Sequence, residues 1–195
     1  WMDYSRKHRE YENQTGPVRR GVGCALFWYN TAVWPISLES CSCRMVLNQD
    51  GSIQLQTGET EIGQGCDTAF AQMAADAVGI PVSDVHVVTA QDTDVTPFGT
   101  GAYASRQTYV GGFAIAQTGA LLKERILKYA CELTRQMPAL LDIVDGRIIR
   151  RTDGRVLMTL GELATEALYS LSHSEHLTAE STYQIKNNAY SFGCS

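Results

Sequence analysis

Two polar turns that contain glycine hold the residues of this sequence whose types and spacing could carry chemistry. Residues 57–68 read Thr-Gly-Glu-Thr-Glu-Ile-Gly-Gln-Gly-Cys-Asp-Thr, and residues 101–108 read Gly-Ala-Tyr-Ala-Ser-Arg-Gln-Thr. Glycine lets a backbone approach a ligand closely, and the free N–H groups at a helix start favour an anion or a strong hydrogen-bond acceptor. The amide of Gln64 offers both donors and an acceptor, which suits the edge of a heterocycle or a metal-bound oxo group.

Both turns are expected where a helix begins. Alternation over 52–57 predicts a strand before the first turn, and the apolar spacing over 69–78 predicts a helix after it. An apolar stripe predicts a long helix over 105–128 directly after the second turn. The two helix starts could therefore converge on one ligand. Glycine-rich turns are also common as purely structural features, so the pattern alone leaves both interpretations open.

The remaining elements predict the fold class. An Asp-Gly turn at 50–51 joins two alternating runs into a hairpin, and Thr159 with Glu162 forms a capping box for a helix that runs through Leu171. A buried strand rich in aromatic residues is expected over 20–29. Other strands are predicted over 84–89, 140–144, 147–151 and 177–185. This order predicts an α+β fold in which helices pack on one face of a mixed sheet.

The chain is expected to have three parts and to be a fragment. An N-terminal helix and linker would occupy 1–20, a core 21–130, and an extension of hairpin, helix and strand 131–195. The sequence begins with tryptophan and stops at 193–195 in what resembles the entry to a strand, so both ends are expected to be cut.

Composition excludes some partners. The chain has 195 residues, of which 44% are hydrophobic, and a formal net charge of −5. Nucleic acids and anionic membranes attract basic patches, so neither is expected as a partner. The sequence has no apolar run near the ~20 residues of a membrane span. We expect a cytoplasmic protein.

Six cysteines raise the question of metals and disulfides. The sequence contains no Cys-x-x-Cys pair, so we expect free thiols in a reducing compartment. Cys66 is the exception, because the first turn of a helix stabilises a thiolate and could make it reactive.

A longer resemblance extends beyond the turns. Residues 58–68 and 72–81, and then Val85-His-Val-Val, Asp92-Thr93, Pro97 and Ala104-Ser105, resemble in order and spacing the molybdenum-cofactor-binding part of the xanthine dehydrogenase and aldehyde oxidase family. The similarity is greatest to bacterial xanthine dehydrogenases, and it fades after about residue 130. The large subunit of that family is several times longer than this chain.

The resemblance implies specific cofactor contacts. Gly63 and Gln64 match the family's cofactor-contacting Gly-Gln pair, and Ala104 matches the residue that lies against the molybdenum. Ser105 and Gln107 match polar positions that reach the pterin. The cofactor is implied to be a molybdenum pyranopterin, either molybdopterin or its cytosine dinucleotide form. Its dithiolene sulfurs hold the metal in the family, so no side chain of this chain is expected to be a metal ligand.

The resemblance also implies what lies outside the chain. The family's general base is a glutamate in a Gly-Glu-Pro segment, which this sequence lacks, and Glu59 and Glu61 fall at a strand end instead. No catalytic residue is therefore expected here, and the chain alone should be inactive. Arg106 could meet a cofactor phosphate or face solvent.

The intact enzyme would hydroxylate xanthine, hypoxanthine or a related heterocycle. It would combine this chain with the rest of the large subunit, and it would pass electrons to iron–sulfur clusters and FAD on partner domains or subunits. One alternative is a non-catalytic remnant or interaction domain of the same fold. Another is a nucleotide-phosphate-binding module, although the sequence lacks the lysine of a phosphate loop.

Overall fold

The chain divides into two units. The computed structural model describes residues 2–36, 39–171 and 174–195. One unit comprises the residues up to Asn30 together with Ala189–Ser195, and the other comprises Thr31–Asn188. Across the part of the chain that is described, no helix is both long and apolar enough to cross a membrane.

The smaller unit contains helix α1 (Met2–Tyr11) and an antiparallel pair of strands, β1 (Leu26–Thr31) and β9 (Ala189–Cys194). Helix α1 confirms the predicted N-terminal helix. The prediction of a buried strand over 20–29 is wrong, because Leu26 and Trp28 are 74% and 67% exposed. A ribbon of two strands has no second layer to cover its apolar side chains within the described residues.

The larger unit is built on a mixed sheet of four strands in the order β4-β3-β2-β8. Strands β2 (Ser40–Leu47) and β3 (Ile53–Thr57) form the predicted antiparallel hairpin. Strand β8 (Thr178–Gln184) lies antiparallel to β2, whereas β4 (Val85–Val87) lies parallel to β3. The register places Met45 opposite Leu55, and both side chains are fully buried.

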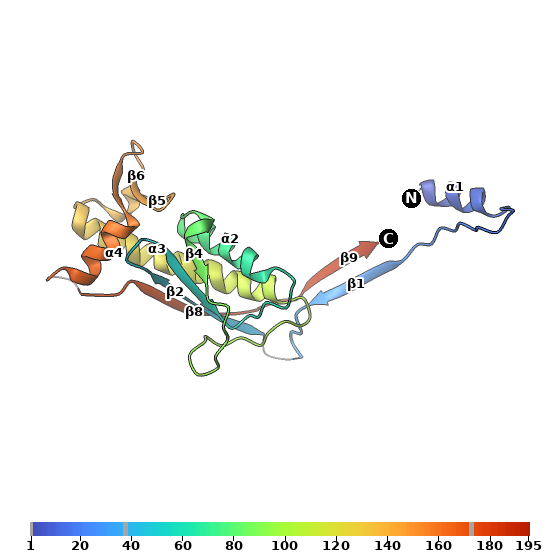
Figure 1. Ribbon diagram of the computed structural model, residues 1–195, viewed down its shortest axis with the longest axis horizontal. Coiled ribbons are helices and arrows are strands. Elements are labelled where there is room, and N and C mark those ends of the chain that lie inside the picture. Colours follow the sequence, from blue (N-terminus) through green and yellow to red (C-terminus); the bar gives the residue numbers. More distant parts are fainter. Residues whose placement is uncertain (1, 37–38, 172–173) are drawn as a thin grey trace. The chain divides into compact units, whose positions relative to one another are not determined.

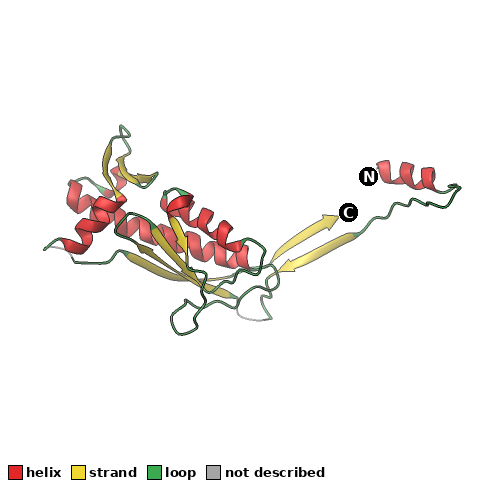
Figure 2. Ribbon diagram, in the orientation of Figure 1, coloured by secondary structure: helices red, strands yellow, loops and turns green. Residues whose placement is uncertain are grey.

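Two helices cover one face of this sheet (Figures 1 and 2), as predicted. Helix α2 (Cys66–Val78) follows the first polar turn, and helix α3 (Gly112–Thr134) follows the second. Gly119 allows the two helices to approach closely, since a Cβ atom there would lie 2.6 Å from the Cβ of Ala77. The core between sheet and helices is formed by buried apolar side chains, among them Met45, Leu55, Phe70, Ile115 and Leu122.

A smaller sheet follows α3. Strands β5 (Leu141–Val144), β6 (Arg147–Arg150) and β7 (Val156–Thr159) are antiparallel neighbours. Helix α4 (Leu160–Tyr169) begins with the predicted capping box and ends two residues earlier than expected. Short 3-10 turns precede β4 at Val82–Asp84 and β5 at Pro138–Leu140.

Strand pairing connects residues that belong to different parts of the predicted three-part division. Strand β8 lies in the predicted extension 131–195, yet it pairs along its length with β2 of the predicted core 21–130. Strand β9 of the same extension pairs with β1. The three-part division stays a prediction about domains, while the hydrogen bonds of the sheet join its second and third parts.

Candidate functional site

The first polar turn leaves β3 and opens into α2. Gly63 and Gly65 both have left-handed backbone conformations, with φ of +97° and +84°. Glycine adopts this conformation without the steric penalty of a Cβ atom. Nothing lies within 4 Å of the position that a Cβ atom would take at either residue. The turn therefore presents bare backbone to open space.

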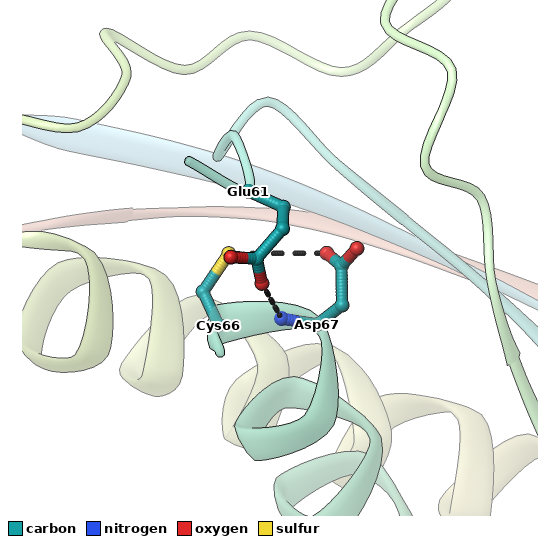
Figure 3. Close-up of side chains that lie close together, drawn as sticks. All are labelled: Glu61, Cys66 and Asp67. Carbon is teal, nitrogen blue, oxygen red and sulfur yellow. Dashed lines mark hydrogen bonds between the residues drawn. The ribbon is translucent and has the colours of Figure 1, made fainter. Parts of the chain in front are cut away.

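A carboxylate of the turn itself caps the start of α2 (Figure 3). Glu61 accepts hydrogen bonds from the backbone N–H groups of Gly63, Gly65 and Asp67, at 2.7, 3.0 and 3.2 Å. These bonds, above all the one from Gly65, lower the pKa of Glu61 to about 2. Three of the N–H donors that could serve an anionic ligand are thus already taken, which argues against a phosphate-binding module.

Glu61 should make the stability of the turn depend on pH. Because its pKa falls from 4.5 to about 2 on folding, the carboxylate stabilises the fold above about pH 4.5, and this contribution is lost as the pH falls toward 2. Glu61→Gln should therefore lower the thermal midpoint at pH 7, with a difference from the wild type that shrinks between pH 5 and pH 2. Glu124→Gln, an exposed site on α3, is the control. A difference that stays constant with pH would contradict this assignment.

Glu61, Cys66 and Asp67 bring three potential metal-ligand atoms within 4.8 Å of one another (Figure 3). The prediction of a reactive thiolate at Cys66 is wrong. The side chain is only 3% exposed, and burial together with the two carboxylates raises the pKa of the thiol to about 12. Both Glu61 oxygens already accept backbone hydrogen bonds. The group is explained as a helix cap.

The second polar turn departs from the predicted helix over 105–128. Ala104 and Ser105 are both left-handed, with φ of 47° and 52°, so no helix can include them. A π-helical turn (Gln107–Gly111) follows, and α3 begins only at Gly112. Each left-handed residue costs about 1–2 kcal/mol. Sequence patterns miss this feature because alanine and serine rarely adopt the conformation.

The two turns meet through the side chains of Gln64 and Gln107. The Gln64 amide donates to the Gln107 carbonyl oxygen, and both amides donate to the carbonyl of Thr60, at 3.1 and 2.8 Å. Gln64 also accepts a bond from the backbone of Ile62 at 2.7 Å. Gln107 is 7% exposed, while Gln64 and Ser105 lie at the surface. Two of the five predicted cofactor residues are thus in direct contact.

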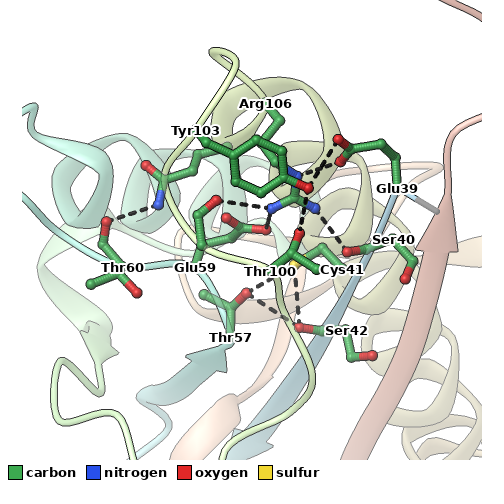
Figure 4. Close-up of polar contacts among 12 residues, drawn as sticks. Glu39, Ser40, Cys41, Ser42, Thr57, Glu59, Thr60, Thr100, Tyr103 and Arg106 are labelled. Carbon is green, nitrogen blue, oxygen red and sulfur yellow. Dashed lines mark hydrogen bonds and ion pairs between the residues drawn. The ribbon is translucent and has the colours of Figure 1, made fainter. Parts of the chain in front are cut away.

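Arg106 does neither of the things expected from the sequence. Its side chain is fully buried and forms ion pairs with Glu39 and Glu59, which are themselves 0% and 1% exposed (Figure 4). It therefore neither faces solvent nor is free to meet a cofactor phosphate. Sequence reasoning missed Glu39 and treated Glu59 only as the end of a strand. No local pattern connects three residues that lie 47 and 67 positions apart.

The buried charges are not fully compensated. Burial raises the pKa of the Glu59 carboxyl above its usual range, and Arg106 opposes this only in part. The second oxygen of Glu59, Oε2, has no hydrogen-bond partner among the described residues. Two carboxylates and one guanidinium are thus enclosed together. Enclosing charged groups costs free energy, and groups with perturbed pKa values cluster at functional sites.

A cleft of about 450 Å³ lies beside the first turn. Its lining comes from Gly58, Thr60 and residues of the loop 91–101. Gly58 and Gly99 allow these two segments to lie close together, since a Cβ atom on Gly58 would lie 2.2 Å from the Gly99 nitrogen. The turns, the amide pair and this cleft form one region at the end of β3.

Known proteins are similar to this chain in sequence and in fold. The sequence model of the molybdopterin cofactor-binding domain matches residues 1–195. The xanthine dehydrogenase molybdenum-binding subunit of Escherichia coli O157:H7 is 44% identical over 194 residues, which are 99% of this chain and 26% of that protein. The carbon monoxide dehydrogenase large chain of Hydrogenophaga pseudoflava is 31% identical over 154 residues, which cover 78% and 19% of the two chains.

The fold comparison agrees. Quinoline 2-oxidoreductase from Pseudomonas putida 86 superposes with a TM-score of 0.75 at 25% identity, over 88% of this chain and 23% of that one. The chain spans about a fifth to a quarter of the length of these relatives. The match over every residue confirms the family prediction and the expected cofactor class: the chain belongs to the molybdopterin cofactor-binding domain family, represented in xanthine dehydrogenase and related molybdenum enzymes.

Proposed function

We propose that Gly63, Gln64, Ala104, Ser105 and Gln107 form part of the wall that holds the molybdenum pyranopterin. The observation that carries this proposal is the direct bond between Gln64 and Gln107, because it joins the two turns that the family resemblance assigns to the cofactor. Open space beside Gly63 and the exposed position of Ser105 leave room for a large polar ligand at the same surface.

The proposed work of these residues is binding and orientation. The amides of Gln64 and Gln107 can donate and accept, so they suit the polar edges and oxo groups of such a ligand. When bound, the cofactor supplies the two-electron redox chemistry, and the protein supplies position and electrostatics. None of the five residues is an acid or a base, and the general base is proposed to lie elsewhere in the large subunit.

For the intact protein, we propose the hydroxylation of xanthine, hypoxanthine or a related heterocycle. The support is the 44% identity to a protein named xanthine dehydrogenase molybdenum-binding subunit, over nearly the whole chain. Iron–sulfur and flavin domains or subunits are the proposed electron acceptors.

The rest of the large subunit is the proposed neighbour of the exposed side chains on β1 and β9, among them Trp28 and Phe192 at 67% and 80% exposure. Large exposed apolar groups that lie together mark interaction surfaces. The six free thiols suit a reducing compartment, so the proposed location is the cytoplasm.

The substrate proposal is tested with the full-length subunit purified together with its partner subunits. Oxidation of hypoxanthine, xanthine and benzaldehyde is measured with a dye as electron acceptor. We expect the purines to give the higher kcat/KM. Faster oxidation of benzaldehyde would contradict the purine assignment. A molybdenum-loaded protein that oxidises none of the three would favour a non-catalytic remnant.

A further inference from the structure

The buried side chain of Arg106 ties together three segments that surround the proposed cofactor wall (Figure 4). Its Nε donates to Glu39 and its Nη1 to Glu59, each at 2.5 Å. Nη1 also donates to the carbonyl of Gly101 at 3.2 Å, and Nη2 donates to the carbonyl of Ser40 at 2.8 Å. The guanidinium thus fastens the start of β2, the end of β3 and the beginning of the second turn.

The fastened backbone is strained where the cofactor is proposed to lie. Ala104 and Ser105, the two residues before Arg106, are both left-handed. Such a pair persists only when its surroundings determine the conformation. Two backbone bonds contribute, from Ala32 to the Ala104 carbonyl at 2.8 Å and from Arg106 to the Tyr103 carbonyl at 3.1 Å. The Arg106 side chain adds the contacts that reach beyond the turn.

Two further anchors restrain the same turn. The Tyr103 hydroxyl donates to Glu39 at 3.1 Å, and the Arg106 guanidinium carbon lies 5.5 Å from the centre of the Tyr103 ring. The same oxygen of Glu39 also accepts a hydrogen bond from the backbone N–H of Val33, at 3.0 Å. Glu39 therefore links the second turn to the segment before β2, and Arg106 completes that link.

The same ion pairs reach the amide pair. Glu59 directly precedes Thr60, whose carbonyl accepts from both Gln64 and Gln107. Arg106 directly precedes Gln107. Arg106 is therefore adjacent to Gln107 in the chain, and it is linked to Gln64 through Glu59 and the carbonyl of Thr60.

We propose that Arg106, anchored by Glu39 and Glu59, is a positioning residue that holds the Ala104–Ser105 turn and the Gln64–Gln107 pair in the form that receives the cofactor. The proposal rests on the cofactor wall proposed above. It assigns Arg106 no contact with the cofactor, because its side chain is fully buried. Groups that orient the residues in contact with a metal centre commonly change metal retention or activity by about 10–100-fold when mutated.

The test uses the full-length subunit with its partner subunits. Arg106→Lys keeps the charge but cannot bridge three segments, because an ammonium group lacks the planar fork of a guanidinium. Arg106→Met removes the charge. The matched control is Arg44→Met, since Arg44 lies on β2 and pairs with Glu180 at the surface, with both side chains at least 40% exposed. Folded protein is collected by size exclusion, and its molybdenum content is measured before and after extended dialysis.

We expect folded Arg106→Lys and Arg106→Met to lose bound molybdenum at least about tenfold faster than the wild type, and the control to match the wild type. A purely structural role would reduce the yield of folded protein but leave the molybdenum in that folded fraction unchanged. Wild-type retention in both folded Arg106 variants would overturn the proposal.

If neither Arg106 variant folds, Glu39→Gln and Glu59→Gln decide by the same measurement, because each keeps the side-chain shape and one acceptor oxygen. Faster loss of molybdenum in either supports the positioning role, and wild-type retention in both overturns it. A wild-type protein without molybdenum would instead overturn the proposed function, together with the site that Arg106 is proposed to position.

Discussion

Arg106→Met is expected to lower the free energy of unfolding of the chain by about 3–5 kcal/mol at pH 7, as is typical when one partner of a buried ion pair is removed. The substitution leaves Glu39 and Glu59 charged and enclosed, and Oε2 of Glu59 already lacks a partner among the described residues. Urea unfolding followed by circular dichroism measures the loss. Arg44→Met, at an exposed ion pair, should cost less than about 1 kcal/mol.

The loss should depend on pH in a defined direction. Burial raises the pKa of the Glu59 carboxyl, and loss of Arg106 removes the charge that opposes this rise, so protonation of Glu59 favours folding as the pH falls. The deficit of Arg106→Met should therefore shrink between pH 7 and pH 5. Neutralising the acids in the triple variant Glu39→Gln, Glu59→Gln, Arg106→Met should recover part of the stability at pH 7. A deficit below 1 kcal/mol at pH 7 would show that the ion pairs do not stabilise the fold as described.

Gln64→Leu in the full-length subunit is expected to reduce cofactor retention by about tenfold or more, because a hydrogen bond to a charged group is worth about 1.5–3 kcal/mol. The leucine cannot donate to the ligand or to Gln107. Retention is measured as molybdenum per folded subunit after dialysis. The control is Gln117→Leu, which makes the same change at an exposed position on α3.

A double variant tests whether the two amides act together. If Gln64 and Gln107 form one binding unit, Gln107→Leu should also weaken retention, and the combined variant should lose less than the sum of the two single losses. Additive losses would indicate two independent contacts. Unchanged retention in both single variants would contradict the proposed wall.

The regular elements could be predicted because their signals are local. The Asp-Gly turn gave the hairpin of β2 and β3, and the capping box at Thr159 gave the start of α4. In each case, residues near in sequence determine the geometry.

The errors arose where the local structure depends on contacts that a local sequence pattern does not reveal. The left-handed pair Ala104 and Ser105 follows from contacts with Ala32 and Arg106, which no helical periodicity reveals. Arg106 was ambiguous because its partners come from two other segments. Cys66 seemed suited to form a thiolate at a helix start, but burial and the charges of Asp67 and Glu61 raise the pKa of its thiol. Aromatic content predicted burial of β1, yet burial depends on neighbours that a strand's own sequence does not specify.

The most direct test of the account is the molybdenum content of the full-length wild-type subunit, measured by mass spectrometry on purified protein and paired with fluorescence analysis of the released pterin. Matching amounts of metal and pterin, near one of each per subunit, are predicted from the family membership and the proposed wall. Folded protein that contains neither metal nor pterin when produced in a host that makes the cofactor would contradict the central claim. The two polar turns would then be the remains of a site with no present function.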